Sequence, residues 1–485
     1  MTAIPDPVRI AARERPDAPA VIAPGETLSY ADLDRRVDGI AAALHAHGLS
    51  RGDRLTVYRS ADVDYLVLLL AAFRAGIVVC PLNTRQPVAA VPALLERIAC
   101  RTLVAEPDPA WGGFDVIEAE YLTSYRRPGG ASLHEPSDWR LDAPATLVFT
   151  SGSTGTPKAA LHTLGNHVMS ARGSVAFFGF GPGDRWLLDL PLYHVGGLAV
   201  LVRCVLAGAA VVLPTRGVPV EETVAAHGVT HASFVATQLL RIVQSGGADA
   251  LVGMKAILLG GSAIPPGLVA DAHALGLPIS TSYGLSEMAS TVAATSPGAS
   301  LDALGTSGVV LPHRELKLAG DGEILVRGAT LFAGYAEGEA VERPDADGWF
   351  PTGDLGAWAG VEGMRMLRVV GRKDHLFISG GENVQPEEVE AALGRLAGVH
   401  RAIVVPVADA EFGQRPVVFV DAEAWEPEAW RDGLGETVAR FKIPVAFHPW
   451  PGDADGEMKV SRAALRERAT SLQLGKGASR SDHTP

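Results

Sequence analysis

A chain of 485 residues, 47% hydrophobic and 20% charged, is long enough to bury a large core and predicts a globular protein with more than one domain. Its formal net charge of −13 leaves no basic surface of the kind that nucleic acid requires, so we expect no nucleic-acid partner. Cys80, Cys100 and Cys204 are few and widely spaced, which argues against a disulfide framework or a zinc cluster and favours buried thiols.

The N-terminus shows no export signal, because Pro5, Asp6 and Pro7 fall where its apolar region would begin. The most apolar run, residues 65–73, is ended by Arg74 well short of the roughly 18 residues that span a bilayer. We therefore expect a buried helix there, no membrane span, and a cytoplasmic protein.

Helical and strand-like patterns alternate through the first three quarters of the chain. Leu33, Val37, Ile40 and Leu44 recur at spacings of four and three, which indicates an amphipathic helix. Short apolar runs typical of buried strands occupy 145–150, 185–191, 209–214 and 255–261. This alternation predicts an α/β fold.

From about Asp302 the pattern becomes β-rich, and alternating apolar positions around a DG pair predict a hairpin within 309–328. A second boundary lies near Gly371. It is followed by strand-like runs at 377–379, 401–407 and 415–420 and by a helix opened by Pro386. We expect an N-terminal domain (1–370), a small α+β domain (371–470) and a disordered polar tail (471–485).

The stretch FTSGSTGTPKAALH, residues 149–162, has the composition of a phosphate-binding loop, with glycines for close backbone approach and a lysine for charge. It is not a Walker A loop, because two residues separate Gly155 from Lys158 and Ala159 follows the lysine. The preceding run is strand-like, and Pro157 suits the first turn of a following helix. The order strand, loop, helix favours phosphate binding over a plain surface turn.

TSGSTGTPK resembles the signature loop of the adenylate-forming superfamily of acyl- and aryl-CoA synthetases, luciferases and nonribosomal adenylation domains. The matching motifs that follow in order are YGLSE (283–287), TGDLG (352–356), GRKDH (371–375), SGGENVQPEEVE (379–390) and GEMKVSR (456–462). The resemblance implies a large N-terminal α/β domain with a β-rich end, a small mobile C-terminal α+β domain, and an active site between them.

The resemblance also implies a role for each matching residue in ATP binding. Loop residues would surround the β- and γ-phosphates, namely Thr150, Ser151, Gly152, Ser153, Thr154, Gly155 and Lys158. Glu287, with Thr154, would hold Mg²⁺. Tyr283 would face adenine, Gly260, Gly261 and Ser262 would let the base approach, and Asp354 and Arg372 would contact the ribose.

For catalysis, the resemblance implies that Lys459 stabilises the charge that develops between the carboxylate and the α-phosphate, beside Lys158 and His194. Asp374 would be the hinge of the mobile domain. Gly380 and Gly381 would line the tunnel for coenzyme A. His375 stands where many relatives carry Asp, so no role is assigned to it.

Arg203 interrupts an apolar run in the segment expected to build the acyl pocket. A desolvated guanidinium needs a partner, which could be an internal Asp or Glu, solvent reached by snorkelling, or an anionic substrate. Similarity of this and neighbouring segments to the o-succinylbenzoate–CoA ligases of menaquinone biosynthesis implies the last. Arg203, Ser233 and Thr291 would then bind the non-reacting carboxylate.

The same similarity implies that His194 and Gly284 line the acyl pocket, although His194 could equally be a hydrogen-bonded core histidine. Ala236 departs from the proline that many relatives carry there, so the local shape of the pocket is not predicted.

We therefore expect an ATP-dependent ligase that uses ATP, Mg²⁺ and coenzyme A to convert o-succinylbenzoate into its CoA thioester through an acyl-adenylate. Alternatives are a CoA ligase for another aryl or acyl carboxylate, an adenylation enzyme that loads a carrier protein, and a degenerate nucleotide-binding protein. The end of the sequence soon after Lys459 favours free coenzyme A over a fused carrier. A homo-oligomer is compatible with the sequence.

Overall fold

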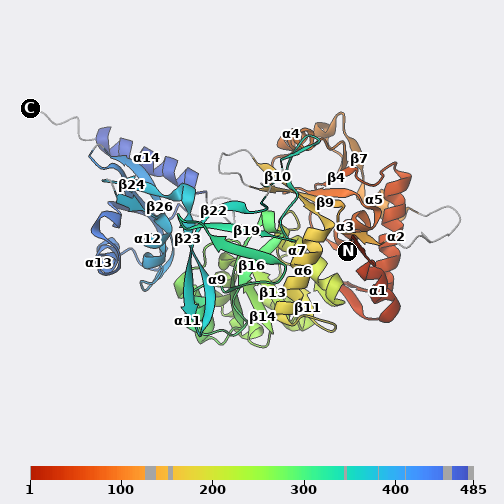
Figure 1. Cartoon of the computed structure of the whole chain (residues 1–485), viewed down its shortest axis with the longest axis horizontal. Coiled ribbons are helices and arrows are strands. Elements are labelled where there is room, and N and C mark those ends of the chain that lie inside the picture. The colour runs from red at the N-terminus through yellow and green to blue at the C-terminus, as the bar shows by residue number, and fades with distance from the viewer. Residues whose placement is uncertain are drawn as a thin grey trace, which may run out of the picture.

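The computed structural model of the protein describes residues 2–125, 138–150, 157–342, 344, 347–380, 382–409, 411–451 and 461–478. Figure 1 shows an elongated molecule with the N-terminal segments at one end, the C-terminal segments at the other and the middle of the chain between them. No helix among these residues is long and apolar enough to cross a membrane. The three cysteines are buried free thiols, as the sequence predicts.

One of the two large sheets has eight strands, and the glycine-rich stretch connects two adjacent ones, β9 (Pro144–Thr150) and β10 (Lys158–Thr163). In spatial order the eight strands are β21 (Ala340–Glu342), β20 (Gly334–Glu337), β10, β9, β5 (Val78–Pro81), β4 (Arg54–Val57), β6 (Thr102–Val104) and β7 (Asp115–Ile117). The strands from β9 to β7 are parallel, whereas β10 and β20 are antiparallel to their neighbours.

The other large sheet has nine strands. They are β17 (Val309–Val310), β16 (Ser290–Ala294), β15 (Ile279–Leu285), β14 (Ala256–Leu259), β13 (His231–Phe234), β11 (Arg185–Leu187), β12 (Ala210–Val212), β2 (Pro19–Ala23) and β3 (Glu26–Ser29). Its centre is parallel and its edges are antiparallel. All four strands expected before residue 262 therefore exist, although three are shorter than their apolar runs.

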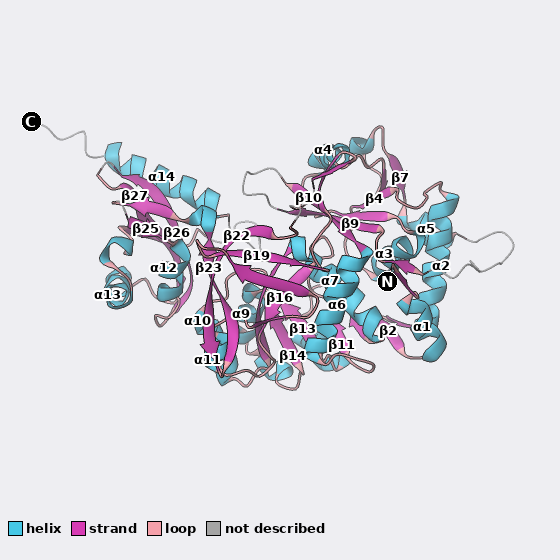
Figure 2. Ribbon diagram, in the orientation of Figure 1, coloured by secondary structure: helices cyan, strands magenta, loops and turns pink. Residues whose placement is uncertain are grey.

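Helices cover these sheets, as Figure 2 shows. They are α1 (Pro7–Glu14), α2 (Tyr30–Ala46), α3 (Val63–Ala75), α4 (Val91–Arg97), α5 (Ala119–Ser124), α6 (Leu164–Phe178), α7 (Val195–Ala207), α8 (Val220–His227), α9 (Ala236–Gln244), α10 (Pro266–Ala274) and α11 (Leu301–Leu304). The predicted amphipathic helix is α2, which opens with a Ser29–Asp32 capping box. Helix α6 packs against α7 and against strands of both large sheets, so it joins them.

Helix α3 is the buried apolar helix that the sequence predicts, and Arg74 lies inside it. The Arg74 side chain is 1% exposed and bonds Asp6, Asp34 and Asp38 at 2.7, 2.6 and 2.8 Å. Three carboxylates thus compensate a charge that would otherwise be costly to bury.

The β-rich part is a four-stranded antiparallel sheet of β18 (Arg314–Leu318), β19 (Glu323–Gly328), β22 (Phe350–Val361) and β23 (Met364–Arg372). The predicted hairpin is β18–β19, in which Leu318 pairs with Ile324 across the DG turn. Alternating side chains of this sheet pack on Met288 and Val292 of the nine-stranded region.

The C-terminal part contains β24 (Phe377–Ser379), β25 (Glu382–Val384), α12 (Pro386–Leu393), β26 (Val399–Asp409), β27 (Gly413–Ala422), α13 (Pro427–Thr437), β28 (Ala446–Pro449) and α14 (Arg462–Ala478). Proline opens α12 as expected. The expected tail is corrected at its start, because α14 continues from 471 to Ala478. The domain limits themselves stay a prediction.

Single-turn 3₁₀ helices connect several of these elements. They are η1 (Val88–Ala90), η2 (Pro109–Trp111), η3 (Gly247–Leu251), η4 (Ser286–Met288), η5 (Lys373–His375) and η6 (Arg440–Lys442). A two-stranded pair, β1 (Ala3–Ile4) with β8 (Trp139–Arg140), fastens the N-terminus. Both η4 and η5 carry residues of the predicted site.

Candidate active site

The glycine-rich stretch connects two paired strands, since Thr150 at the end of β9 lies opposite Lys158 at the start of β10. The expected helix after the loop is therefore wrong, because β10 follows at once and α6 begins only at Leu164. The predicted phosphate ligands Ser151, Gly152, Ser153, Thr154 and Gly155 lie outside the described residues. Among the described residues, Lys158 at the start of β10 is the cation that flanks this stretch.

Lys158 and Glu287 are brought together by Tyr335, a residue that sequence reasoning missed. The Lys158 Nζ lies 4.8 Å from the centre of the Tyr335 ring, and the Tyr335 hydroxyl donates to Glu287 Oε1 at 2.5 Å. Burial, together with the Glu287 charge, raises the pKa of Tyr335. The arrangement sets a cation and a carboxylate beside the loop, which fits Mg²⁺ bound to phosphate, since Mg²⁺ takes few protein ligands.

Tyr283, Asp354 and Arg372 form the second predicted part of the ATP site. The Tyr283 hydroxyl donates to Asp354 Oδ2 at 2.6 Å, and Arg372 Nη1 donates to Asp354 Oδ1 at 3.1 Å. Pairing of β22 with β23 sets Asp354 opposite Arg372. Burial, then the Asp354 charge, raises the pKa of Tyr283. Only 9% of Tyr283 is exposed, so stacking of adenine on its ring stays a prediction.

Gly260, Gly261 and Ser262 follow β14 at the carboxyl end of the parallel strands. A Cβ on Gly260 would lie 2.5 Å from Ser282 Oγ, and Gly261 has a φ of 81°. The positive φ thus favours glycine at 261 for a reason within the fold, and a side chain at 260 would force the Ser282 hydroxyl to move, whether or not a base approaches. Ligand sites of parallel sheets lie at this edge.

Arg203 is buried without a carboxylate partner among the described residues. It projects from α7 and is 1% exposed. Its Nη2 donates to Ser174 Oγ at 3.4 Å, its guanidinium lies 4.1 Å from the centre of the Trp186 ring, and its Nε and Nη1 have no partner in this part of the chain. Burial lowers its pKa to about 10, so it remains a cation at neutral pH. Its burial excludes snorkelling, and no internal ion pair is found for it within the described ranges of the chain.

Ser233, Gly284 and Thr291 lie on three strands of the nine-stranded sheet: Thr291 on β16 and Gly284 on β15 are on neighbouring strands, and Ser233 is on β13, beyond β14. Ser233 Oγ accepts from Trp186 Nε1 at 3.1 Å, which ties it to the ring under Arg203. Thr291 on β16 is 5% exposed and pairs with Gly284 on β15, where a Cβ would lie 2.4 Å from Ser290 O. Ser233 and Arg203 therefore both contact the Trp186 ring. The missing side chain of Gly284 allows β16 to lie close to β15.

His194 is an exposed residue at the N-cap of α7, with its ring 4.7 Å from that of Tyr193. A buried core histidine is thereby excluded. The backbone at Val235 donates to Gln238 Oε1 at 2.9 Å, and Gln238 Nε2 donates to Asp189 Oδ2 at 2.6 Å. Gln238 thus fixes the segment before Ala236, the position that lacks the usual proline.

In the C-terminal part, Asp374 on η5 accepts from Arg372 Nε at 3.0 Å. Gly380 has a φ of 59°, and a Cβ there would lie 2.8 Å from the Phe412 ring. His375, which has no assigned role, bonds Glu387 at 2.6 Å.

Lys459 and Gly381 lie outside the described residues. Close to Lys459 in the sequence, Arg462 bonds both oxygens of Glu390 at 2.5 and 3.1 Å, which anchors the start of α14 on α12.

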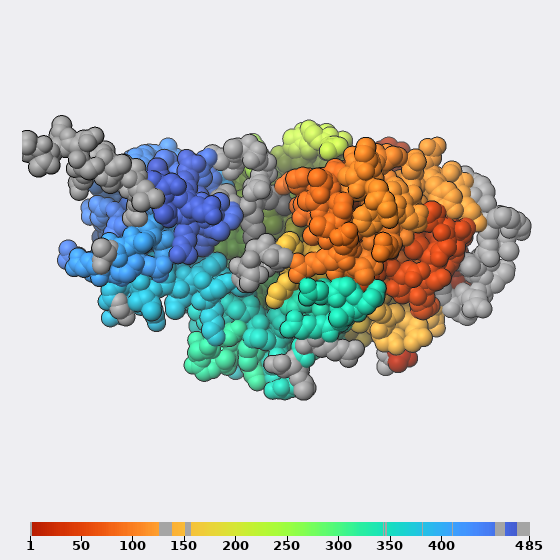
Figure 3. Space-filling view, turned by 90° about the horizontal axis from the view of Figure 1, so that it is seen from above, coloured from red at the N-terminus to blue at the C-terminus, as the bar shows by residue number. Residues whose placement is uncertain are grey.

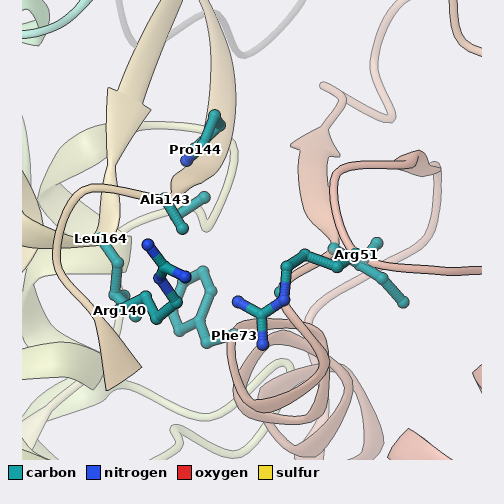
Figure 4. Close-up of a pocket in the computed structure, with 9 residues that line it drawn as sticks. Arg51, Phe73, Arg140, Ala143, Pro144 and Leu164 are labelled. Carbon is teal, nitrogen blue, oxygen red and sulfur yellow. The ribbon is translucent and has the colours of Figure 1, made fainter. Parts of the chain in front are cut away.

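In Figure 3 the C-terminal part and the first 125 residues lie at opposite ends of the molecule, with the middle of the chain between them. A separate pocket lies at the start of β9, the end remote from the glycine-rich stretch. Figure 4 shows Arg51 and Arg140 beside Phe73 in it. Its cavity of about 10 Å³ has room for little more than one water molecule, so it is not the substrate site.

Comparison with known proteins agrees with this geometry. The family model described as "AMP-binding enzyme" matches residues 8–336. A 2-succinylbenzoate–CoA ligase of Salmonella typhimurium is 36% identical, over 93% of this chain and 95% of that protein. The corresponding enzyme of Bacillus licheniformis is 32% identical, over 89% and 93%.

Solved structures give the same result. An o-succinylbenzoate CoA synthetase from Bacillus subtilis in complex with the acyl-adenylate intermediate OSB-AMP superposes with a TM-score of 0.83 at 29% identity, over 97% of this chain and 98% of that one. The same enzyme in complex with ATP and magnesium ion gives 0.82 at 30% identity, over 92% and 96%. The chain therefore belongs to the family of AMP-binding enzymes and is an AMP-forming acid–thiol ligase.

Proposed function

We propose that this enzyme converts 2-succinylbenzoate into its CoA thioester, as the relatives' names indicate for those proteins. The observation that carries the proposal is the buried Arg203 guanidinium with two unpartnered nitrogens among the described residues. This acid has a ring carboxylate besides the succinyl carboxylate that reacts. The ring carboxylate can supply the missing counter-charge, whereas a simple benzoate or a fatty acid cannot.

In the first half-reaction a succinyl carboxylate oxygen attacks the α-phosphorus of ATP, and pyrophosphate leaves. Catalysis of such a displacement consists mainly of positioning and charge stabilisation. Glu287, held by Tyr335, would bind Mg²⁺, which would neutralise phosphate charge, and Lys158 lies over the same Tyr335 ring. Asp354 and Arg372 would hold the ribose. Lys459 would meet the charge that accumulates at the reacting oxygens.

In the second half-reaction the sulfur of coenzyme A attacks the acyl carbonyl, and AMP leaves with the bonding electrons. We infer that the C-terminal part rotates about Asp374 between the two steps, so that Gly380 and Gly381 line the path of the pantetheine. His194, at the exposed N-cap of α7, would contact the acyl group. ATP and coenzyme A are cytoplasmic metabolites, so the proposal includes a cytoplasmic location.

The test is ATP–pyrophosphate exchange with 2-succinylbenzoate and with a panel of benzoates, cinnamates and fatty acids, followed by assay of the CoA thioester. Exchange confined to 2-succinylbenzoate, followed by its thioester, is the expected result. Comparable exchange with a monocarboxylate would overturn the substrate assignment while leaving the adenylation chemistry intact.

Substitution Arg203→Met tests the observation that carries the proposal. Loss of charged hydrogen bonds to the ring carboxylate should lower kcat/KM for 2-succinylbenzoate about a hundredfold. Arg74→Lys, a change at a buried arginine that already has three carboxylates, controls for destabilisation. An unchanged kcat/KM in Arg203→Met would return Arg203 to a structural role.

A further inference from the structure

A second buried arginine, Arg314 at the start of β18, lies close to Arg203. Arg314 is 6% exposed. It donates to three backbone carbonyls from separate segments: Pro312 O at 3.0 Å, Ser170 O at 3.2 Å, and Thr291 O. Among the described residues no carboxylate pairs with it. It is thus a buried cation whose partners are all neutral, unlike Arg74.

The fold is shaped to admit this side chain. Gly173 on α6 faces it, and a Cβ at that position would lie 2.5 Å from Arg314 Nη2 and 2.7 Å from Pro312 O. Any larger residue at position 173 would displace the guanidinium. Burial, with repulsion from Arg203, lowers the pKa of Arg314 to about 9, so it stays protonated at neutral pH.

A short hydrogen-bonded chain on α6 connects the two arginines. Arg314 Nη2 and Ser174 Oγ both donate to the Ser170 carbonyl, at 3.2 and 3.1 Å. Ser174 Oγ in turn accepts from Arg203 Nη2 at 3.4 Å. Two buried cations that have no carboxylate partner among the described residues are therefore connected through Ser174 and the Ser170 carbonyl, and charges in a buried environment interact strongly.

Arg314 also stabilises the backbone of the predicted site between Glu287 and Thr291. Its Nη1 holds the carbonyl of Thr291, and Ser170 Oγ donates to Ala289 O at 2.7 Å. Between these two carbonyls Ala289 and Ser290 have φ values of 51° and 111°, which non-glycine residues rarely adopt. Arg314 thus helps to hold a strained turn that joins Glu287 to Thr291.

We propose that Arg314 is a positioning and specificity-determining residue, which selects dicarboxylic over monocarboxylic acyl substrates by adding a second positive charge behind Arg203 and by fixing the Thr291 strand. A substrate carboxylate at the free nitrogens of Arg203 is attracted by both cations. A neutral substrate group at the same position would supply no counter-charge to Arg203 or Arg314. The inference rests on the proposed function and deepens it.

The experiment compares kcat/KM for 2-succinylbenzoate with kcat/KM for benzoylpropionate, the same keto acid without the ring carboxylate. Arg314→Met should lower the ratio of the two values about tenfold, mainly through KM for 2-succinylbenzoate, because one of two attracting charges is lost. Arg314→Lys keeps the charge and should keep the ratio within about threefold, even where its melting temperature falls. Arg74→Lys controls for loss of stability at a buried arginine far from the site.

Equal losses for both acids in Arg314→Met, or a loss of selectivity in Arg314→Lys as large as in Arg314→Met, would overturn the inference. Arg314→Gln, which is uncharged but can still donate hydrogen bonds, replaces the methionine variant if that variant does not fold. A wild-type enzyme that treats the two acids alike would instead contradict the proposed function, and the anion site with it.

Discussion

At the scale of single residues, two buried arginines differ in their counter-charges. Arg74 is buried against three carboxylates, whereas Arg203 is equally buried and bonds one serine and an aromatic face. Burying an ion without a counter-ion costs several kcal/mol. The incompletely partnered guanidinium of Arg203 therefore supports the proposal that an anionic ligand binds there.

Tyr335 provides the first prediction at this scale. Its hydroxyl donates to Glu287 at 2.5 Å and so orients the carboxylate expected to bind Mg²⁺. Tyr335→Phe should lower kcat/KM for MgATP about tenfold, the usual value of a hydrogen bond to a charged group, and raise the Mg²⁺ concentration required for half-maximal rate. KM for the carboxylic acid should not change.

The measurement is initial-rate pyrophosphate exchange across a series of Mg²⁺ concentrations. Tyr58→Phe is the matched control, because the Tyr58 hydroxyl donates to the Gln86 carbonyl on the part of the chain before the loop. If Tyr335→Phe showed the same Mg²⁺ dependence as the wild-type enzyme, the hydrogen bond from Tyr335 would not be needed to orient Glu287.

At the scale of secondary-structure elements, two buried histidines connect neighbouring elements: His162 joins β10 to the turn that carries Glu287, and His167 joins α6 to β9. His162 Nε2 bonds Ser286 O at 2.7 Å, and His167 Nε2 bonds Thr146 Oγ1 at 2.8 Å. Burial lowers the pKa of His162 to about 4, and burial likewise lowers that of His167. Burial therefore keeps both rings neutral at neutral pH, and only protonation at a desolvated position opposes the folded state.

Stability should therefore fall as the pH drops from about 6.5 to about 4. Below pH 6.5 the unfolded chain takes up a proton on His162 that the folded chain refuses, so the free energy of unfolding decreases by up to about 3 kcal/mol for this group. In His162→Gln, whose amide can still donate to Ser286 O, the loss between pH 7 and pH 4.5 should be smaller by about 2 kcal/mol.

Urea unfolding at both pH values measures this difference. His273→Gln, at an exposed position of α10, controls for the exchange of histidine for glutamine itself. The same pH dependence in His162→Gln and in wild-type protein would rule out His162 as the titrating group.

Element patterns explain which parts of this architecture could be predicted. Periodicity predicts α2 and the β18–β19 hairpin, because burial of one face dictates a spacing, whereas α3 follows from an uninterrupted apolar run. After the glycine-rich stretch, the preference of proline for a helix start misleads at Pro157, because β10 pairs with β9. Tyr335 carries no local signal, since only the pairing of β10 with β20 brings it to Lys158. Contacts that depend on long-range strand pairing cannot be deduced from spacing along one chain.

At the scale of the whole molecule, η5 is the passage from the β-rich sheet to the C-terminal part. Arg372 bonds Asp354 on one side and Asp374 on the other, and the next residues lead directly into β24. His375 and Arg462 both bond Glu387, at 2.6 and 3.4 Å, so the segment after Asp374 is fastened to α12 and α14. Rotation of the C-terminal part as a unit would therefore concentrate its backbone change near residue 374.

Asp374→Pro tests that rotation. Proline fixes φ near −65°, which lies within the usual φ range of a 3₁₀ turn such as η5, and so should favour the present arrangement over others. Pyrophosphate exchange and CoA thioester formation should then respond differently, with one half-reaction within about threefold of wild type and the other lowered more than about tenfold. Asp374→Ala, which removes the contact with Arg372 but leaves the backbone free, should affect both steps alike. Equal losses in Asp374→Pro would mean that both half-reactions use one arrangement, because a change confined to a hinge alters only the step that needs the other one.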